Sequence, residues 1–218
     1  MATRLSSLKK EIVMKIIKAG YEILTPINRE EILAQIEIAA RCCYKSEDKI
    51  TPASGEKLVK RLVKMGHTAM IEHANITVKF TCDRGVSHEI VRHRLASYAQ
   101  ESTRYCNYAK DKFGNEITVI KPFFAKEGSP EYVEWESAML HAEKSYFALL
   151  DKGWTPQEAR SVLPNSLKTE IIVTMNMRAW RHFFQLRTAK ESHPQMREVA
   201  IPLLAEFAEK LPELFGDI

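Results

Sequence analysis

Glycine, proline and cysteine are scarce in this chain of 218 residues, which contains 8, 9 and 4 of them respectively. The glycines and prolines are scattered, so no linker divides the sequence and we expect a single domain over residues 1–218. These low counts exclude the collagen-like and the disulfide-rich secreted classes of protein. No run of about 18 apolar residues occurs, so no transmembrane helix is expected.

The cysteines also lack the spacing that metal sites need. Cys42 and Cys43 are adjacent, Cys82 and Cys106 are isolated, and no C-x-x-C pair occurs. The first residues have no apolar core of the kind found in signal peptides. We therefore expect reduced thiols, no structural disulfide and a cytoplasmic location.

Nucleotide-binding motifs based on glycine are missing as well. The sequence contains neither G-x-G-x-x-G nor G-x-x-x-x-G-K-[ST], so neither a Rossmann nor a P-loop site is indicated. The net charge of +4 falls well short of the dense cationic surface of a dedicated duplex-binding protein. With 45% hydrophobic and 28% charged residues, the composition is that of an ordinary globular protein.

Hydrophobic periodicity predicts an irregular alternation of helices and strands. The clearest strand covers residues 74–82, where Ile76, Val78 and Phe80 alternate with polar residues. Capping signals predict the starts of several helices. We expect strands within 13–24, 74–82, 116–121 and 170–175, helices over 28–41, 55–65, 83–94, 130–151, 155–163, 177–189 and 194–211, an irregular stretch from 95 to 115, and a short extension at 1–12. This order predicts an α+β fold with helices packed on a mixed or antiparallel sheet.

The segment from Arg92 to Tyr105 has three arginines, a histidine and only one acid, Glu101. Guanidinium groups with hydroxyl groups nearby are suited to binding phosphate. From the residues alone, three interpretations stay open: a solvated basic face, a phosphate site, or contact with nucleic acid. Tyr98, Tyr105 and Tyr108 keep the third one open, because bases stack on aromatic rings.

Two other segments hold unusual polar groups. His67, Glu72 and His73 precede the strand at 74–82, but their spacing differs from the H-E-x-x-H pattern of zinc sites. We therefore expect no metal there, and instead contacts with a ligand or a neighbouring subunit.

Arg187 falls on the same side of the helix expected near it as Trp180 and Phe183. An arginine on that side would be partly buried, and a buried guanidinium needs an anionic or carbonyl partner. The acids available for an internal ion pair are Glu170 and Glu191.

The order Arg92-His93-Arg94, seven residues, then Ser102 and Arg104-Tyr105 resembles the RHR-x7-S signature of flavin-dependent thymidylate synthases. Other segments resemble the same family in the same order, over roughly residues 14–210. They are His67–His73, Ala159–Pro164, Asn176–Arg178, Leu186–Arg187 and Ser192–His193.

The resemblance implies a reaction, a set of ligands and an assembly. The family methylates dUMP to dTMP with the methylene group of 5,10-methylenetetrahydrofolate, which leaves as tetrahydrofolate. Reduced FAD supplies the hydride, and NADPH reduces the flavin again. The family fold is α+β, and the family assembles as a homotetramer with its active sites between subunits. For an enzyme of this kind we expect neither a membrane nor nucleic acid as a partner.

The resemblance also implies roles for single residues. Arg92, Ser102 and Arg187 match catalytic positions, and Arg187 matches the one beside the uracil ring, where a cation stabilises developing negative charge. His193 matches a position near the folate and NADPH. The positions implied to bind dUMP are Arg92, Gln100, Glu101, Ser102, Thr103, Arg104, Arg160 and Arg187. The positions implied to contact FAD are Cys43, His67, Arg92, His93, Arg94, Gln100, Asn176, Arg178 and His182.

The sequence departs from the family's pattern at several positions. Ala99-Gln100 stands where many members have Asn-Glu, so a carboxylate is missing there. Cys43 replaces a common serine, Ala69 a threonine, Glu89 a glutamine and His182 an asparagine. Two alternative functions stay open: a basic RNA- or single-strand-binding module, and a flavoprotein of the same fold that acts on another pyrimidine nucleotide.

Overall fold

The computed structural model describes residues 14–110 and 113–218. The extension predicted at residues 1–12 lies outside the described residues. Among the described residues we find no helix whose length and hydropathy would let it span a bilayer.

The chain divides into two compact units, each with its own hydrophobic core. The larger unit consists of residues 19–100 and 169–218, and the smaller unit of residues 1–18 and 101–168. The boundary at Gln100 and Glu101 falls inside the segment that resembles the family signature. The single domain expected over the whole chain stays a prediction.

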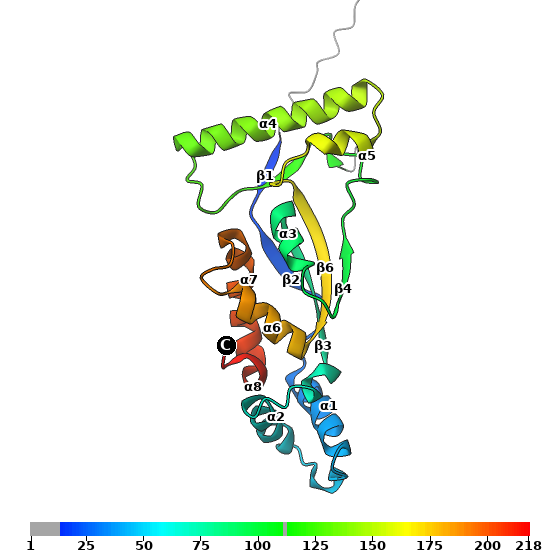
Figure 1. Cartoon of the computed structure of the whole chain (residues 1–218), viewed down its shortest axis with the longest axis vertical. Helices are drawn as coiled ribbons and strands as arrows, with labels where there is room; N and C mark the ends of the chain where they lie inside the picture. The colour runs from blue at the N-terminus through cyan, green and yellow to red at the C-terminus, as the bar shows by residue number, and fades with distance from the viewer. Residues whose placement is uncertain (1–13, 111–112) are drawn as a thin grey trace, which may run out of the picture. The chain divides into compact units, whose positions relative to one another are not determined.

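The larger unit combines a four-stranded sheet with helices (Figure 1). Its strands are β2 (Gly20–Ile23), β3 (Asn75–Asp83), β4 (Ala96–Gln100) and β6 (Lys168–Asn176, of which Lys168 belongs to the smaller unit). Its helices are α1 (Arg29–Cys42), α2 (Ser54–Lys64), α3 (Arg84–Ile90), α6 (Met177–Arg187), α7 (Pro194–Lys210) and α8 (Pro212–Phe215), with the short 3-10 helices η1 (Glu47–Lys49) and η2 (Met70–His73).

The sheet has the strand order β2-β3-β6-β4. Strand β2 runs antiparallel to β3, and β4 runs antiparallel to β6. The predicted alternation in β3 is confirmed, because Ile76, Val78 and Phe80 are fully buried. Helices α6, α7 and α8 gather on one side of this sheet in Figure 1. Together with the parallel strands of the smaller unit, this confirms the α+β class with mixed sheets.

Trp180 fixes the rotation of α6 against the sheet. Its indole N–H donates to the Ile76 carbonyl at 3.0 Å, and its ring stacks on Phe184 with the centroids 5.7 Å apart. Because this face of α6 is buried, the opposite face, with Arg178 and His182, is exposed. The core therefore decides which polar side chains of α6 are available to a ligand.

The smaller unit contains β1 (Lys15–Ile17) and β5 (Thr118–Ile120), which pair in parallel, together with α4 (Pro130–Asp151), α5 (Pro156–Ala159) and the 3-10 helix η4 (Arg160–Val162). Its two α-helices begin where the sequence predicts. The Ser129 hydroxyl accepts from the Tyr132 N–H at 3.2 Å, and Thr155 forms a capping box with Glu158. These caps satisfy N–H groups that a helix start leaves without partners.

The structure corrects the prediction between residues 83 and 100. The helix expected over 83–94 ends at Ile90, and part of the stretch expected to be irregular forms β4. Leu95 has the left-handed φ of 63°, which reverses the chain between these two elements. Strand β4 escapes a pattern-based prediction because it is only half-buried and lacks apolar alternation. The short helix α8 was also not predicted.

Candidate active site

The turn between α3 and β4 carries Arg92, His93 and Arg94. Helix α3 stops because the Ile90 carbonyl accepts from the His93 N–H at 3.1 Å and from the Tyr98 hydroxyl at 3.0 Å. The single proton of this hydroxyl is shared with the His93 carbonyl, which also lies within hydrogen-bond distance. The two arginines are exposed, whereas His93 points inward and is 6% exposed. Tyr98 thus holds a turn that presents two guanidinium groups outward and one imidazole inward.

Arg187, at the end of α6, donates to this turn and to the end of α3. Its Nε donates to His93 Nε2 at 2.8 Å, its Nη1 to Glu89 Oε2 at 2.8 Å, and its Nη2 to the Glu89 carbonyl at 2.9 Å. The prediction that Arg187 is partly buried with an anionic or carbonyl partner is confirmed. The partner is Glu89, and not Glu170 or Glu191, because the end of α6 lies beside the end of α3.

His93 is a neutral ring in this arrangement. Burial lowers the pKa of His93 to about 4, and the nearby Arg187, His182 and Arg92 add to the lowering. Since its Nε2 accepts from Arg187, the ring proton lies on Nδ1. The ring packs against Phe183, with the centroids 5.0 Å apart. At neutral pH, His93 therefore serves as an acceptor that orients Arg187.

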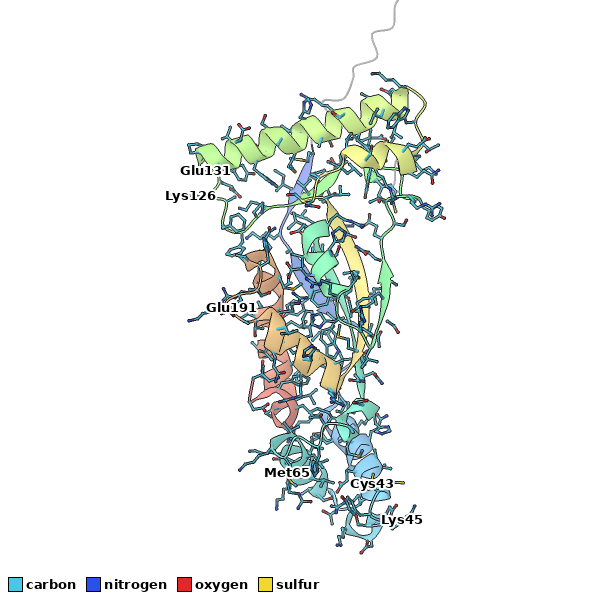
Figure 2. The ribbon with its side chains drawn as sticks, in the orientation of Figure 1. Cys43, Lys45, Met65, Lys126, Glu131 and Glu191 are labelled. Atoms are coloured by element: carbon cyan, nitrogen blue, oxygen red, sulfur yellow. The ribbon has the colours of Figure 1, made fainter. Side chains whose placement is uncertain are left out.

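A cavity of about 670 Å³ adjoins these residues, and we call it the RHR pocket. Its lining consists of the turn residues Arg92, His93, Arg94 and Leu95, the α6 residues His182, Leu186 and Arg187, and Ala189, Glu191 and Ser192, which follow α6. Figure 2 labels Glu191 in this last segment. Three arginines and one acid favour an anionic or carbonyl-rich ligand. The pocket brings together five of the predicted site residues from two separate segments of the chain.

Because His93 is neutral in the folded protein, acid should destabilise the fold. A histidine whose folded pKa is lowered contributes stability above its unfolded pKa, and that stability is lost as the pH falls from about 6.5 to about 4. Relative to the unsubstituted protein, His93→Gln should lose less free energy of unfolding across this window, by up to about 1.4 kcal/mol per pH unit. Urea unfolding between about pH 7 and pH 4 measures both slopes. Equal slopes would contradict a neutral, buried His93.

Two residues implied to bind cofactors cap helices instead of lining the RHR pocket. The Asn176 side chain accepts from the Ala179 N–H at 2.8 Å at the start of α6. The His193 ring accepts through Nδ1 from the Gln195 N–H at 3.2 Å at the start of α7. Each side chain keeps a further nitrogen that these caps do not use.

Gln100 and Glu101 are held by contacts within the protein. The Gln100 amide donates to the Ser87 hydroxyl at 2.9 Å and to the Thr169 hydroxyl at 3.3 Å. The Glu101 carboxylate pairs with Lys168 at 2.9 Å. These contacts use the Gln100 amide nitrogen and one oxygen of Glu101, whereas the Gln100 side-chain carbonyl is not part of them.

The remaining predicted flavin contacts lie around η2 and the end of α1. Arg178 pairs with Glu72 at 2.6 Å. His67 lines a separate cavity of about 410 Å³, and Cys43, labelled in Figure 2, lies with its sulfur 3.8 Å from that of Met70. Within the larger unit, His67 therefore lines a different cavity from the RHR pocket. Among the described residues no group of three potential metal ligands occurs.

In the smaller unit, Arg104 contacts a residue of α5, and Arg160 directly follows this helix. Together with Ser102 we call these two residues the arginine cluster. Arg160 Nη1 donates to the Thr103 hydroxyl at 3.2 Å, and Arg104 Nη2 lies 3.5 Å from Gln157 Oε1. The Ser102 hydroxyl accepts from the Arg104 N–H at 3.3 Å. These partners are neutral and both arginines are exposed, so their charges are available to an anion.

The tyrosines that kept a nucleic-acid interpretation open do not form a stacking surface. The half-buried Tyr98 uses its hydroxyl in the turn, and Tyr108 is buried against Tyr146. Tyr105 is exposed, with the Arg104 guanidinium 5.3 Å from its ring centroid. Single-strand binders use several exposed rings on which successive bases stack. The geometry therefore disfavours the nucleic-acid-binding alternative.

Two supporting residues of the site were not predicted in their roles. Glu89 drew notice only as a departure from the family pattern, and Tyr98 only as a ring for stacking. Local pattern gives no signal for Glu89, because α3 ends at Ile90 and no helical turn relates Glu89 to His93. Nothing local in the sequence shows that the end of α6 packs there either.

Comparison with known proteins identifies the family. Residues 27–213 match the family described as thymidylate synthase complementing protein. A flavin-dependent thymidylate synthase of Geobacter sulfurreducens is 34% identical over 191 residues, which cover 84% of this chain and 81% of the relative. The chain belongs to the flavin-dependent thymidylate synthase family. The resemblance stated from the signature residues is thereby confirmed.

Further members of the family show the same relationship. The flavin-dependent thymidylate synthase of Pyrococcus furiosus is 36% identical over 167 residues, covering 76% of this chain and 68% of the relative. Among solved structures, a UMP/dUMP methylase, PolB from Streptomyces cacaoi, bound with 5-Br UMP, has a TM-score of 0.74 at 21% identity. The match covers 93% of this chain and 95% of the methylase chain. At this identity the likeness supports the fold alone.

Proposed function

We propose that this chain methylates dUMP to dTMP, with 5,10-methylenetetrahydrofolate as the one-carbon donor, FAD as the hydride carrier and NADPH as the reductant. Membership of the family supports the reaction as a whole. The structural observation that carries it is Arg187, a partly buried guanidinium in the RHR pocket whose three nitrogens are all engaged. A cation fixed in this way suits negative charge that develops on a pyrimidine.

Two sets of donors are proposed to serve the nucleotide, and each set offers a distinct chemistry. The arginine cluster, with Ser102, Arg104 and Arg160, suits the phosphate, because guanidinium groups and a hydroxyl donate to its oxygens. Arg187 suits a uracil carbonyl, and Arg92 lies exposed in the same pocket. In this proposal, Arg187 stabilises the charge on the ring as C5 becomes the nucleophile.

The donors of the RHR pocket fit a flavin nucleotide. FAD carries an anionic diphosphate and a ring rich in carbonyl groups, and the pocket offers the exposed side chains of Arg92, Arg94 and His182. We assign these residues and His93 to FAD, which supplies the hydride when bound. His93 is proposed to orient Arg187 and not to donate a proton, because its low pKa keeps it neutral.

No cysteine is proposed as a nucleophile. Burial raises the pKa of Cys82 to about 12, so its thiol stays protonated at neutral pH. None of the four cysteines, all of which the structure describes, lines the RHR pocket. Activation of the uracil ring is therefore assigned to Arg187 and the flavin chemistry.

Tritium release from dUMP labelled at C5 tests the proposed function. Release together with dTMP formation is expected only when FAD, NADPH and 5,10-methylenetetrahydrofolate are all supplied. UMP should be run beside dUMP, because a flavoprotein acting on another pyrimidine nucleotide is the alternative. Methylation of UMP without methylation of dUMP would favour that alternative, and neither reaction would refute both.

We further propose a homotetramer with active sites between subunits. The resemblance assigns His67 and the RHR pocket to one flavin, yet His67 lines a different cavity of the larger unit. Residues shared between subunits would reconcile these two positions. Four chains of 25.0 kDa give an expected mass of about 100 kDa by sedimentation. A stable, flavin-loaded monomer would contradict this assembly.

A further inference from the structure

The cavity of about 410 Å³ that His67 lines has no ligand assigned to it so far, and we call it the basic cavity after its lining. The lining comes from the end of α1, the short helix η1, α2 and the residues that follow α2. All of these residues belong to the larger unit. None of them lines the RHR pocket, so the two cavities can hold different ligands.

Gly66 turns the chain at the end of α2 and so completes the cavity. Its φ of 73° is left-handed, and the His67 N–H donates to the Leu62 carbonyl at 2.9 Å. These are the features of a helix C-terminal cap that reverses the chain. His67 is thereby returned to Leu62, and both residues line the cavity. Met65, labelled in Figure 2, lies just before this turn and lines the cavity too.

The charge of the cavity is positive. Its lining contains no acid, and its basic residues are Arg41, Lys49, Arg61 and His67. Arg41 is paired with Glu37 at 2.8 Å. Among the described residues, by contrast, Lys49 and Arg61 have no side-chain hydrogen bond or ion pair. Two positive charges therefore remain available to an anionic ligand.

This charge is not a general property of the two helices. A second cavity, of about 510 Å³, is also lined by α1 and the start of α2, but its charged residues are Arg29, Glu30, Glu37 and Glu56. Arg29 is moreover paired with Glu56 at 2.8 Å. Of these two cavities, only the basic cavity offers cations without partners.

Apolar side chains lie beside these cations in the lining. Leu58 and Leu62 are buried, whereas Met65 is 57% exposed and Tyr44 is 83% exposed. An exposed aromatic ring and a thioether both pack well against another ring. The cavity therefore suits a ligand that combines an aromatic ring with more than one anionic group.

The proposed reaction has four ligands, and two of them still lack an anion site. The phosphate of dUMP is assigned to the arginine cluster, and FAD to the RHR pocket. The remaining anionic groups are the phosphates of NADPH and the carboxylates of the folate. In a folate these carboxylates follow an aminobenzoyl ring, and each further γ-linked glutamate adds one more. A ring followed by separate carboxylates matches an apolar lining with two separate cations.

We propose that the basic cavity binds the p-aminobenzoyl-glutamate end of 5,10-methylenetetrahydrofolate, with Lys49 and Arg61 pairing with the carboxylates of a γ-linked oligoglutamate. This inference rests on the proposed function and specifies its one-carbon donor as a polyglutamylated folate. The two cations come from different elements, Lys49 from η1 and Arg61 from α2, so they can meet successive carboxylates of one chain.

Binding of p-aminobenzoyl-tetraglutamate, which has no pterin, tests the site without turnover. In calorimetry, Lys49→Ala and Arg61→Ala should each weaken binding about two- to fivefold, as expected for one exposed ion pair. Lys60→Ala is the matched control, because it removes one exposed charge from α2 outside both cavities, and it should leave the affinity unchanged. An equal loss in Lys60→Ala would show unspecific attraction by charge and overturn the site. A loss of FAD from Lys49→Ala or Arg61→Ala would assign the cations to the flavin instead.

Kinetics with two forms of the co-substrate separates this inference from the proposed function. The unsubstituted protein should have a KM about 5- to 20-fold lower for tetraglutamyl than for monoglutamyl 5,10-methylenetetrahydrofolate, and the variant with both Lys49→Ala and Arg61→Ala should lose this preference. Its KM for NADPH should not change. A raised KM for NADPH with the preference intact would give the cations to the reductant and overturn the assignment to folate. Formation of dTMP without any preference would overturn this inference alone, whereas no dTMP from either folate would overturn the proposed function.

Discussion

Arg187→Ala should lower kcat for dTMP formation by about 10²- to 10³-fold, the loss seen when one preorganised donor to a developing negative charge is removed. The guanidinium is fixed before the substrate binds, because His93 and Glu89 hold all three of its nitrogens. No reorganisation is then needed when charge develops on the uracil ring. Single-turnover kinetics on FAD-loaded protein measures the step directly.

The alanine variant also leaves the Glu89 carboxylate without its ion-pair partner, so a second variant is needed. Arg187→Lys keeps one positive charge but cannot reach three acceptors with a planar fork. It should restore the melting temperature more than it restores kcat. Full turnover in Arg187→Ala with FAD and dUMP bound would show that charge on the uracil is stabilised elsewhere.

Local chemistry in the sequence predicted much of the fold. The alternation of Ile76, Val78 and Phe80 located β3, and Asn28, Ser129 and Thr155 marked the first turns of three helices. Side-chain caps and apolar periodicity depend on neighbours a few residues away, so a single sequence displays them. The same reasoning predicted that Arg187 would be partly buried and paired.

The partners in the site depend on contacts across long stretches of chain. Arg187 lies 98 positions from Glu89 and 94 from His93. No periodicity encodes such a contact, and the sequence analysis accordingly named Glu170 and Glu191 as the available acids. The end of α3 was missed for a similar reason, because the Tyr98 hydroxyl that engages its last carbonyl comes from the next strand.

The signature could be located from the sequence alone. That it is divided between the two compact units could not. Arg92, His93 and Arg94 belong to the larger unit, and Ser102 and Arg104 to the smaller one. A motif read along the chain suggests one continuous anion site. The structure instead gives two sets of donors with different chemistry, a held guanidinium in the RHR pocket and exposed guanidinium groups in the arginine cluster. Substitutions in the two sets should therefore affect different properties of the enzyme.

Arg104→Ala is the substitution that separates them most clearly, and it should weaken dUMP binding about 10- to 150-fold. One charge-assisted hydrogen bond contributes about 1.5–3 kcal/mol, and that range converts to this factor. Because Arg104 is exposed, the effect should lie at the lower end of the range in high salt. Calorimetric titration of dUMP at two ionic strengths measures it, and the flavin content should equal that of the unsubstituted protein.

Two comparisons test whether Arg104 binds the phosphate of dUMP. Deoxyuridine, which lacks the phosphate, should bind Arg104→Ala and the unsubstituted protein with equal affinity, because the proposal assigns the base to Arg187 and not to Arg104. Lys126→Ala removes one exposed positive charge from the same unit, on the loop before α4 (Figure 2), and should change dUMP affinity by less than about twofold. If Arg104→Ala lost deoxyuridine and FAD together with dUMP, Arg104 would support the fold around α5 and the phosphate would be held by other groups.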